Sequence, residues 1–158
     1  MSIEIIDLNN LYFPYKEDLV EYYDKYFAKD GNVLNFKNHP LTIFAKDYVR
    51  LGKRVLDNLD DHVFIKYEYD RYRDADTVKN NTHKHNATKR IMNLIDSIKK
   101  YGYCEGRFNH SRFMIRVNKV FKSPYGDNEN GYTLKTRKHR AAACIALGIK
   151  NVKVRIVN

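Results

Sequence analysis

The segment from residue 131 to residue 157 constrains the fold of this chain more than any other part. A β-type run at 132–134 leads into a basic cluster at 137–140, and an alanine-rich stretch follows and ends at Gly148. A second run, at 152–157, alternates apolar and basic residues. Alternation is typical of a strand, and a glycine often ends a helix, so the segment predicts a strand–turn–helix–strand unit.

The turn of this unit is a candidate anion site. Arg137, Lys138, His139 and Arg140 stand at the predicted helix start, where backbone N–H groups lack helical partners and attract phosphate. From residue 130 onward the sequence has no Asp or Glu, and we interpret its other basic residues as candidate contacts to nucleic acid: Lys135, Lys150, Lys153 and Arg155. An ordinary solvated surface is the alternative. The small residues at 141–143 argue against it, because they favour close packing of the helix and leave room beside the turn.

Composition favours one domain and an anionic partner. The chain has 158 residues, with 29 Lys plus Arg against 19 Asp plus Glu, a formal charge of +10. This charge favours nucleic acid or nucleotide phosphates, with solubility alone as the alternative. We expect a cytoplasmic protein without membrane association, because no run of about 18 apolar residues is present and the acidic N-terminus is unlike a signal peptide. Two cysteines make no disulfide framework. The 13 Tyr with no Trp are typical of AT-rich coding sequences, as in phages or low-GC bacteria.

Apolar spacing and turn residues predict the remaining elements. The predicted helices span about 15–28, 41–61 and 88–102, the strands 63–69 and 113–117, a polar loop 70–89 and a turn 119–130. We expect an α+β fold, a small mixed sheet with packed helices. Residues 1–62 would form an N-terminal helical extension and 63–158 the main domain of one compact unit. The tyrosines of the first helix predict a packing surface, with stacking on bases or contact with a protein partner as alternatives. His83 and His85 lack neighbouring ligands, so no metal site is predicted.

The segments 94–102 and 132–149, closed by 152–157, resemble the ParB/sulfiredoxin-like superfamily. Its members have a helix with a Ser-Ile-x-x-x-Gly-type end and a strand-to-helix turn with a Gly-x-His-Arg pattern, which His139 and Arg140 match. The resemblance covers about residues 88–158. It implies a small mixed sheet with helices that binds ATP, ADP or CTP, with His139 and Arg140 as phosphate ligands, Lys138 at the variable position and Glu105 in place of a glutamine. The other candidate nucleotide contacts are Thr136 and Arg137 at the turn, with Tyr103 and Arg107 after the first glycine.

The sequence departs from this pattern at two positions. Arg137 replaces the glycine that opens the turn, so it would have to adopt the backbone angle that glycine tolerates. Lys138 replaces the cysteine of sulfiredoxins, which excludes reduction of sulfinic acids.

These observations lead to two expectations about function. The first is a protein that binds ATP or CTP with Mg²⁺, as a phosphotransferase or NTP hydrolase if it is an enzyme, with Glu105 and Asp96 as candidate catalytic carboxylates. The second is a non-enzymatic module that binds DNA or RNA, or regulates a partner, through the same basic face. The motifs of P-loop, dinucleotide-binding, serine-hydrolase and zinc-protease families are absent from the sequence.

Overall fold

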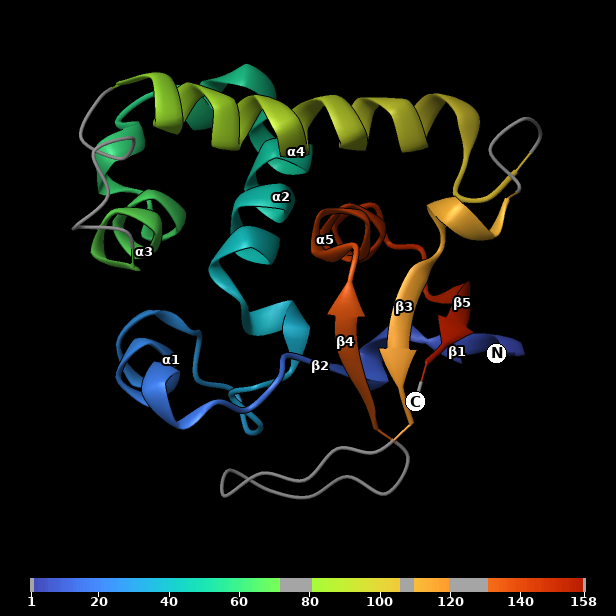
Figure 1. Cartoon of the computed structure of the whole chain (residues 1–158). Coiled ribbons are helices and arrows are strands. Elements are labelled where there is room, and N and C mark those ends of the chain that lie inside the picture. Colours follow the sequence, from blue (N-terminus) through green and yellow to red (C-terminus); the bar gives the residue numbers. More distant parts are fainter. Residues whose placement is uncertain (1, 72–80, 106–109, 120–130, 158) are drawn as a thin grey trace.

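The computed structural model describes residues 2–71, 81–105, 110–119 and 131–157, and these form an α+β fold (Figure 1). A five-stranded sheet has the order β1-β5-β3-β4-β2. The strands are β1 (Ser2–Asp7), β2 (Leu11–Tyr12), β3 (Ile115–Asn118), β4 (Tyr132–Thr136) and β5 (Asn151–Ile156). The α-helices of the described part are α1 (Val20–Tyr26), α2 (Pro40–Leu51), α3 (Val63–Arg71), α4 (Asn81–Tyr101) and α5 (Lys138–Ala146). The predicted fold class is confirmed: β3–β5 and β2–β4 are parallel, whereas β1–β5 and β3–β4 are antiparallel.

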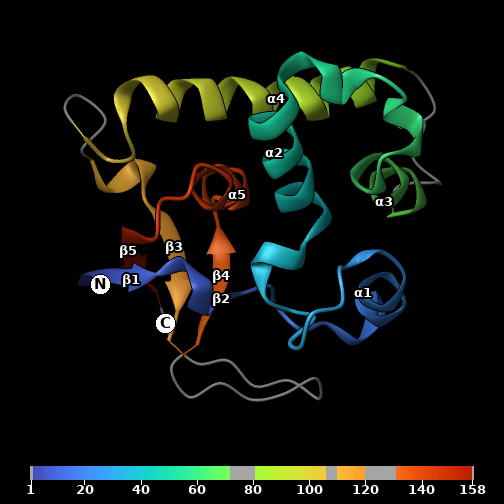
Figure 2. The same cartoon turned by 180° about the vertical axis from the view of Figure 1, so that it is seen from behind.

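The predicted C-terminal unit is present. Strand β4 ends at Thr136, α5 begins at Lys138, the chain turns at Gly148 with a φ of 75°, and β5 follows. Helix α5 lies above the sheet and packs against α2 and α4 (Figures 1 and 2). Its residues Ala141–Cys144 are fully buried. Small side chains let this helix approach its neighbours closely, which holds the turn before it in a fixed place.

One face of the sheet carries the core. The side chains of Ile115, Val117, Val152, Val154 and Ile156 are buried in a single cluster with α5, α2 and α4. Because side chains alternate along a strand, the residues between them point to the opposite face. Strand β1 pairs with β5 along its whole length, from Ser2 opposite Ile156 to Asp7 opposite Asn151. The N-terminal segment, for which only helices were predicted, therefore also supplies β1 and β2 to the sheet.

The strand predicted at 63–69 is wrong, because this segment is helix α3. Its buried residues Phe64, Ile65, Tyr67 and Glu68 lie at helical spacing. His62 caps the helix start, since its Nδ1 accepts a hydrogen bond from the backbone N–H of Phe64 at 3.0 Å. The Phe64 ring packs 5.4 Å from that of Phe44 in α2. Capping and packing outweigh the β propensity of these residues.

Other boundaries also differ from the prediction. The loop predicted at 70–89 is wrong for residues 70–71, which belong to α3, and for residues 81–89, which belong to α4, whereas 72–80 lie outside the described residues. The helix predicted at 41–61 ends at Leu51 and continues as short 3₁₀ turns. The tyrosine stripe of α1 serves packing: Tyr23 is buried, and the rings of Tyr22 and Tyr26 lie edge-on to the ring of Tyr67 in α3.

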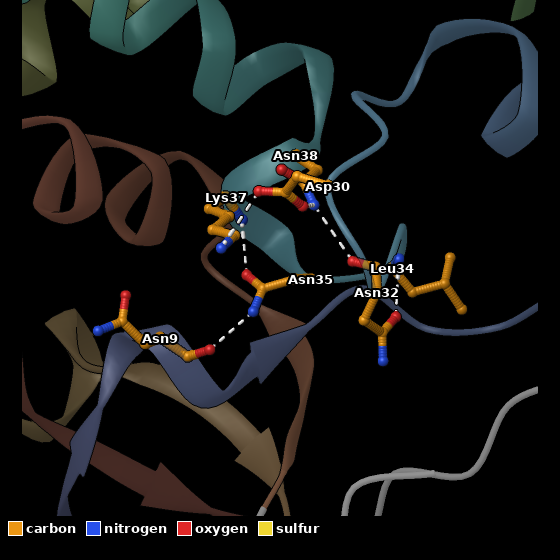
Figure 3. A network of polar contacts seen from close by, with 7 residues as sticks. All are labelled: Asn9, Asp30, Asn32, Leu34, Asn35, Lys37 and Asn38. Carbon is orange, nitrogen blue, oxygen red and sulfur yellow. Dashed lines mark hydrogen bonds and ion pairs between the residues drawn. The ribbon is translucent and has the colours of Figure 1, made fainter. Parts of the chain in front are cut away.

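A network of asparagines orders the segment 30–38 beside β2 (Figure 3). The side chain of Asn35 donates to the carbonyl of Asn9 at 2.7 Å and accepts from the N–H of Lys37 at 3.0 Å. Asn38 donates to Asp30 at 2.5 Å and to the carbonyl of Asn32 at 3.1 Å. In this segment the carbonyl of Leu34 accepts a hydrogen bond from the backbone N–H of Phe13 at 2.7 Å. The network thereby fixes the chain that leaves β2.

The helices of the described residues include none with the length and apolar character that a membrane span requires.

Candidate anion-binding site

The turn between β4 and α5 is held in an unusual backbone conformation. Arg137 has φ 73° and ψ 40°, the left-handed region that glycine favours, and no side chain caps the start of α5. The Arg137 guanidinium donates to the carbonyl of Arg112 at 2.9 Å. The guanidinium of Arg140 lies 4.9 Å from the ring centre of Phe113, and that of Arg112 lies 4.8 Å from the same ring. These contacts fasten the turn to the segment before β3 and bring three arginines together.

Two pockets open on either side of this turn. The first, which we call the β4 pocket, has a volume of about 480 Å³ and is lined by Phe13, Pro14, Lys16, Arg90, Arg116, Leu134, Lys135, Thr136, Arg137, Lys138 and His139. The second, the α4 pocket, has about 440 Å³ and is lined by Arg90, Asn93, Leu94, Ser97, Arg137, His139 and Arg140. Arg90, Arg137 and His139 line both pockets. Among the residues that the structure describes, neither lining includes Asp or Glu.

Crowding of positive charge and burial shift the pKa values of the turn. Burial, together with the smaller effect of the charges of Arg90 and Lys138, lowers the pKa of His139 to about 4. Burial also lowers the pKa of Lys138, with Arg71 and Arg90 adding to the effect while Glu68 opposes it. The pKa of Arg140 is lowered by burial and by Arg137. A bound anion would relieve this repulsion, so the turn favours negatively charged ligands.

Several predicted site residues meet at the turn. Thr136, Arg137, Lys138, His139 and Arg140 line one pocket or both, and Lys135 lines the β4 pocket. Tyr103 has a different position, because its hydroxyl donates to the carbonyl of Lys153 at 2.7 Å and accepts from the N–H of Ile115 at 2.9 Å. It therefore ties the end of α4 to β3 and β5. Arg107 lies outside the described residues.

The two candidate carboxylates lie away from these pockets. Glu105 is exposed, and its side chain lies over Gly102. It lines a third pocket together with Tyr103 and Lys153, and this pocket shares no lining residue with the β4 and α4 pockets. The Asp96 carboxylate accepts a hydrogen bond from the hydroxyl of Tyr48 in α2 at 2.8 Å. Their catalytic roles stay predictions, and the structure does not bring them together with the turn.

Sequence reasoning missed part of the site. Arg90, Asn93 and Ser97 lie on the face of α4 that meets the turn, and their spacing of three and seven residues was the available signal. Lys16 and Arg116 join the β4 pocket from distant elements, for which the sequence offers no signal. Glu68 is a buried carboxylate on α3 that raises the Lys138 pKa and lies 3.5 Å from His83. It was missed because α3 was predicted to be a strand.

The described residues contain no group of three or more His, Cys, Asp and Glu that could hold a metal ion. Comparisons with protein-family models, with curated proteins and with solved structures found no match. The fold and site define the class only as an α+β protein with two adjoining basic pockets at a strand-to-helix turn.

Proposed function

We propose that this protein binds a nucleotide, ATP or CTP, with the nucleoside in the α4 pocket and the phosphates on the turn. The observation that carries the proposal is the pair of pockets that share Arg90, Arg137 and His139. An apolar and hydrogen-bonding surface adjoins a dense group of cations there, which matches the two halves of a nucleotide.

The α4 pocket has the surface that a nucleoside needs. Asn93, Leu94 and Ser97 form one face of α4 opposite the start of α5. The Asn93 amide and the Ser97 hydroxyl each donate and accept hydrogen bonds, which suits a base edge or a sugar, and Leu94 offers apolar contact. The volume of about 440 Å³ falls within the range of small-molecule sites, roughly 300–1,000 Å³.

The turn has the groups that phosphates need. The N–H groups at the start of α5 have no side-chain cap, and the left-handed residue before a helix is a geometry that aims successive N–H groups at an anion. Arg137, His139 and Arg140 surround this point in the α4 pocket, and Lys138 adds a charge on the β4 side. Charge-assisted contacts of this kind are stronger than those of neutral donors.

The expected Mg²⁺ would arrive with the nucleotide. The residues described in both linings include no carboxylate, the ligand that Mg²⁺ prefers, so only phosphates and water would hold it there. A phosphotransferase or NTP hydrolase would also need a group to orient the acceptor. Glu68, whose charge raises the pKa of Lys138, lines neither pocket, and neither do Glu105 and Asp96, so no carboxylate is assigned to that role. We therefore propose binding first and leave catalysis as a further hypothesis.

Calorimetry with ATP, ADP, CTP and GTP, with and without Mg²⁺, tests the proposal. At about 100 times its dissociation constant the bound nucleotide should add roughly 2.7 kcal/mol to the free energy of unfolding. Ser97→Leu, which fills the α4 pocket without changing charge, and Arg140→Ala should each weaken binding at least about tenfold, since one lost charge-assisted contact costs about 1.5–3 kcal/mol.

Lys66→Ala is the matched control, because Lys66 is exposed on α3 and lines neither pocket. It should bind as the unaltered protein does. A urea unfolding curve of each variant checks that the fold is retained. The proposal fails if none of the four nucleotides binds, or if both pocket variants bind as tightly as the control.

A further inference from the structure

The outer face of the sheet carries a row of cations. Val152, Val154 and Ile156 of β5 are buried in the core, so Lys153 and Arg155 between them point to the other face. The pairing register places Arg155 beside Arg116 of β3, and Arg116 beside Thr136 of β4. On the other side, β1 sets Ile3 opposite Arg155 and Ile5 opposite Lys153, and both isoleucines are exposed, at 54% and 69%.

This row continues into the β4 pocket. Arg116 belongs to both, because it stands beside Arg155 on the sheet and lines the pocket with Lys135, Lys16 and Lys138. Its Nε atom is buried and makes no hydrogen bond within the described part of the chain. Neighbouring strands are about 4.8 Å apart and alternate residues of a strand about 6.6 Å, so the backbone positions of Arg116 and Lys153 lie about 8 Å apart, diagonally across the two strands. A mononucleotide bound at the turn would not contact Arg155 or Lys153, because neither residue lines a pocket there.

The pocket exists because β2 is short. Strand β2 pairs with β4 only through Leu11 opposite Tyr132 and Tyr12 opposite Thr133. The next residue, Phe13, bonds instead to Leu34, so the chain leaves β4 and opens a space beside residues 134–136. Phe13, which is partly buried, and Pro14 add apolar surface to this lining, in which cations otherwise predominate. Aromatic and apolar walls beside cations are the arrangement by which proteins hold single strands.

We propose that the β4 pocket and the outer face of the sheet bind a single strand of nucleic acid, with its phosphates on the cations and one base against Phe13. A pocket of about 480 Å³ admits one nucleotide unit but not a duplex. The row of cations ends at β1, where the exposed side chains of Ile3 and Ile5 are apolar. This binding and the proposed nucleotide site both use the cations of the turn, but Lys153 and Arg155 line neither pocket, so changes at these two residues affect the strand alone.

Fluorescence anisotropy with labelled DNA and RNA strands of about 20 nucleotides tests this inference, with duplex DNA of the same length for comparison. The double variant Lys153→Glu/Arg155→Glu should weaken single-strand binding at least about tenfold. If each cation neutralises one phosphate, the slope of log affinity against log salt should become shallower by about 1.4, measured between about 50 and 200 mM salt. Binding of the mononucleotide should be unchanged.

The matched control is Lys53→Glu/Lys66→Glu, which changes the charge equally at exposed positions on other elements. It should keep most of the affinity. The inference is overturned if the sheet variant binds like the unaltered protein, if the control loses as much, or if duplex binds more tightly than a single strand. Ser97→Leu separates the two proposals: it should remove mononucleotide binding and spare the strand, so a failure of one is distinguishable from a failure of the other.

Discussion

Arg137 holds a backbone angle that costs free energy for every residue with a Cβ atom. Its φ of 73° places it in the left-handed region, which costs a non-glycine residue about 1–2 kcal/mol. Its guanidinium offsets part of this cost by donating a hydrogen bond to the carbonyl of Arg112. The resemblance implies glycine at this position, and Arg137 adopts a left-handed angle of the kind that glycine tolerates.

Two variants separate the backbone from the side chain at this residue. Arg137→Gly and Arg137→Ala both remove the guanidinium, but only alanine keeps the left-handed strain. We expect the glycine variant to have a free energy of unfolding about 1 kcal/mol higher than the alanine variant, measured by urea denaturation. Both should lose nucleotide affinity to the same extent. Equal stability of the two variants would show that the turn relaxes to another conformation.

His139 makes stability depend on pH. Its folded pKa is about 4, against an ordinary value of 6.5, so the unfolded chain takes up the proton first as pH falls. Its contribution to the free energy of unfolding is therefore fully present above pH 6.5 and is lost between 6.5 and about 4. After allowance for solvent screening the loss is roughly 2 kcal/mol.

His139→Gln tests this dependence, because glutamine keeps polarity without titrating. Urea unfolding of both proteins at several pH values should show a smaller decline for the variant below pH 6.5. His39 is buried and has a lowered pKa as well, but it is present in both proteins and cancels in the comparison. Parallel declines would contradict the low pKa of His139.

At the scale of elements, the sequence predicts a helix or strand correctly where the residues that define it lie within the same segment. Strand β4, helix α5 and strand β5 were predicted because alternation, small residues and Gly148 all lie within the segment. Helix α3 was not, because β-type residues fill it and its cap is His62 rather than the common Ser, Thr, Asp or Asn. The turn could likewise be predicted. For the facing side of α4 the spacing of Arg90, Asn93 and Ser97 was a signal for a shared face, but tertiary packing decides that this face meets the turn.

The buried alanines of α5 should not tolerate substitution by larger side chains. Ala142 is fully buried, in a helix packed against α2, α4 and the sheet. Ala142→Leu should lower the free energy of unfolding by about 1–3 kcal/mol, because extra volume forces strained rotamers or backbone shifts in a dense core. Ala146→Leu is the control on the same helix, since Ala146 is only partly buried. The packing argument fails if both variants have the same midpoint in urea.

At the scale of the whole molecule, the first third of the chain completes the structure around the last third. Strand β1 covers the edge of β5 along its length, and Ile6 and Leu8 are buried in the same cluster as β5 and α5. Helix α2 packs directly against α5 and contributes the buried Phe44. These partners are far apart in the sequence, which is why periodicity alone predicted only helices for this region. The division expected at residue 62 thus falls between segments that share one core.

A fragment of residues 63–158 is therefore expected not to fold alone. It would lack β1, β2 and α2, so β5 would become an open edge and the buried face of α5 would meet water. Circular dichroism and urea titration should show weak, non-cooperative unfolding for the fragment and one cooperative transition for the full chain. Adding residues 1–62 as a separate peptide should restore part of the transition if shared burial is the cause. A fragment that unfolds cooperatively by itself would instead establish residues 1–62 as an extension of an autonomous domain.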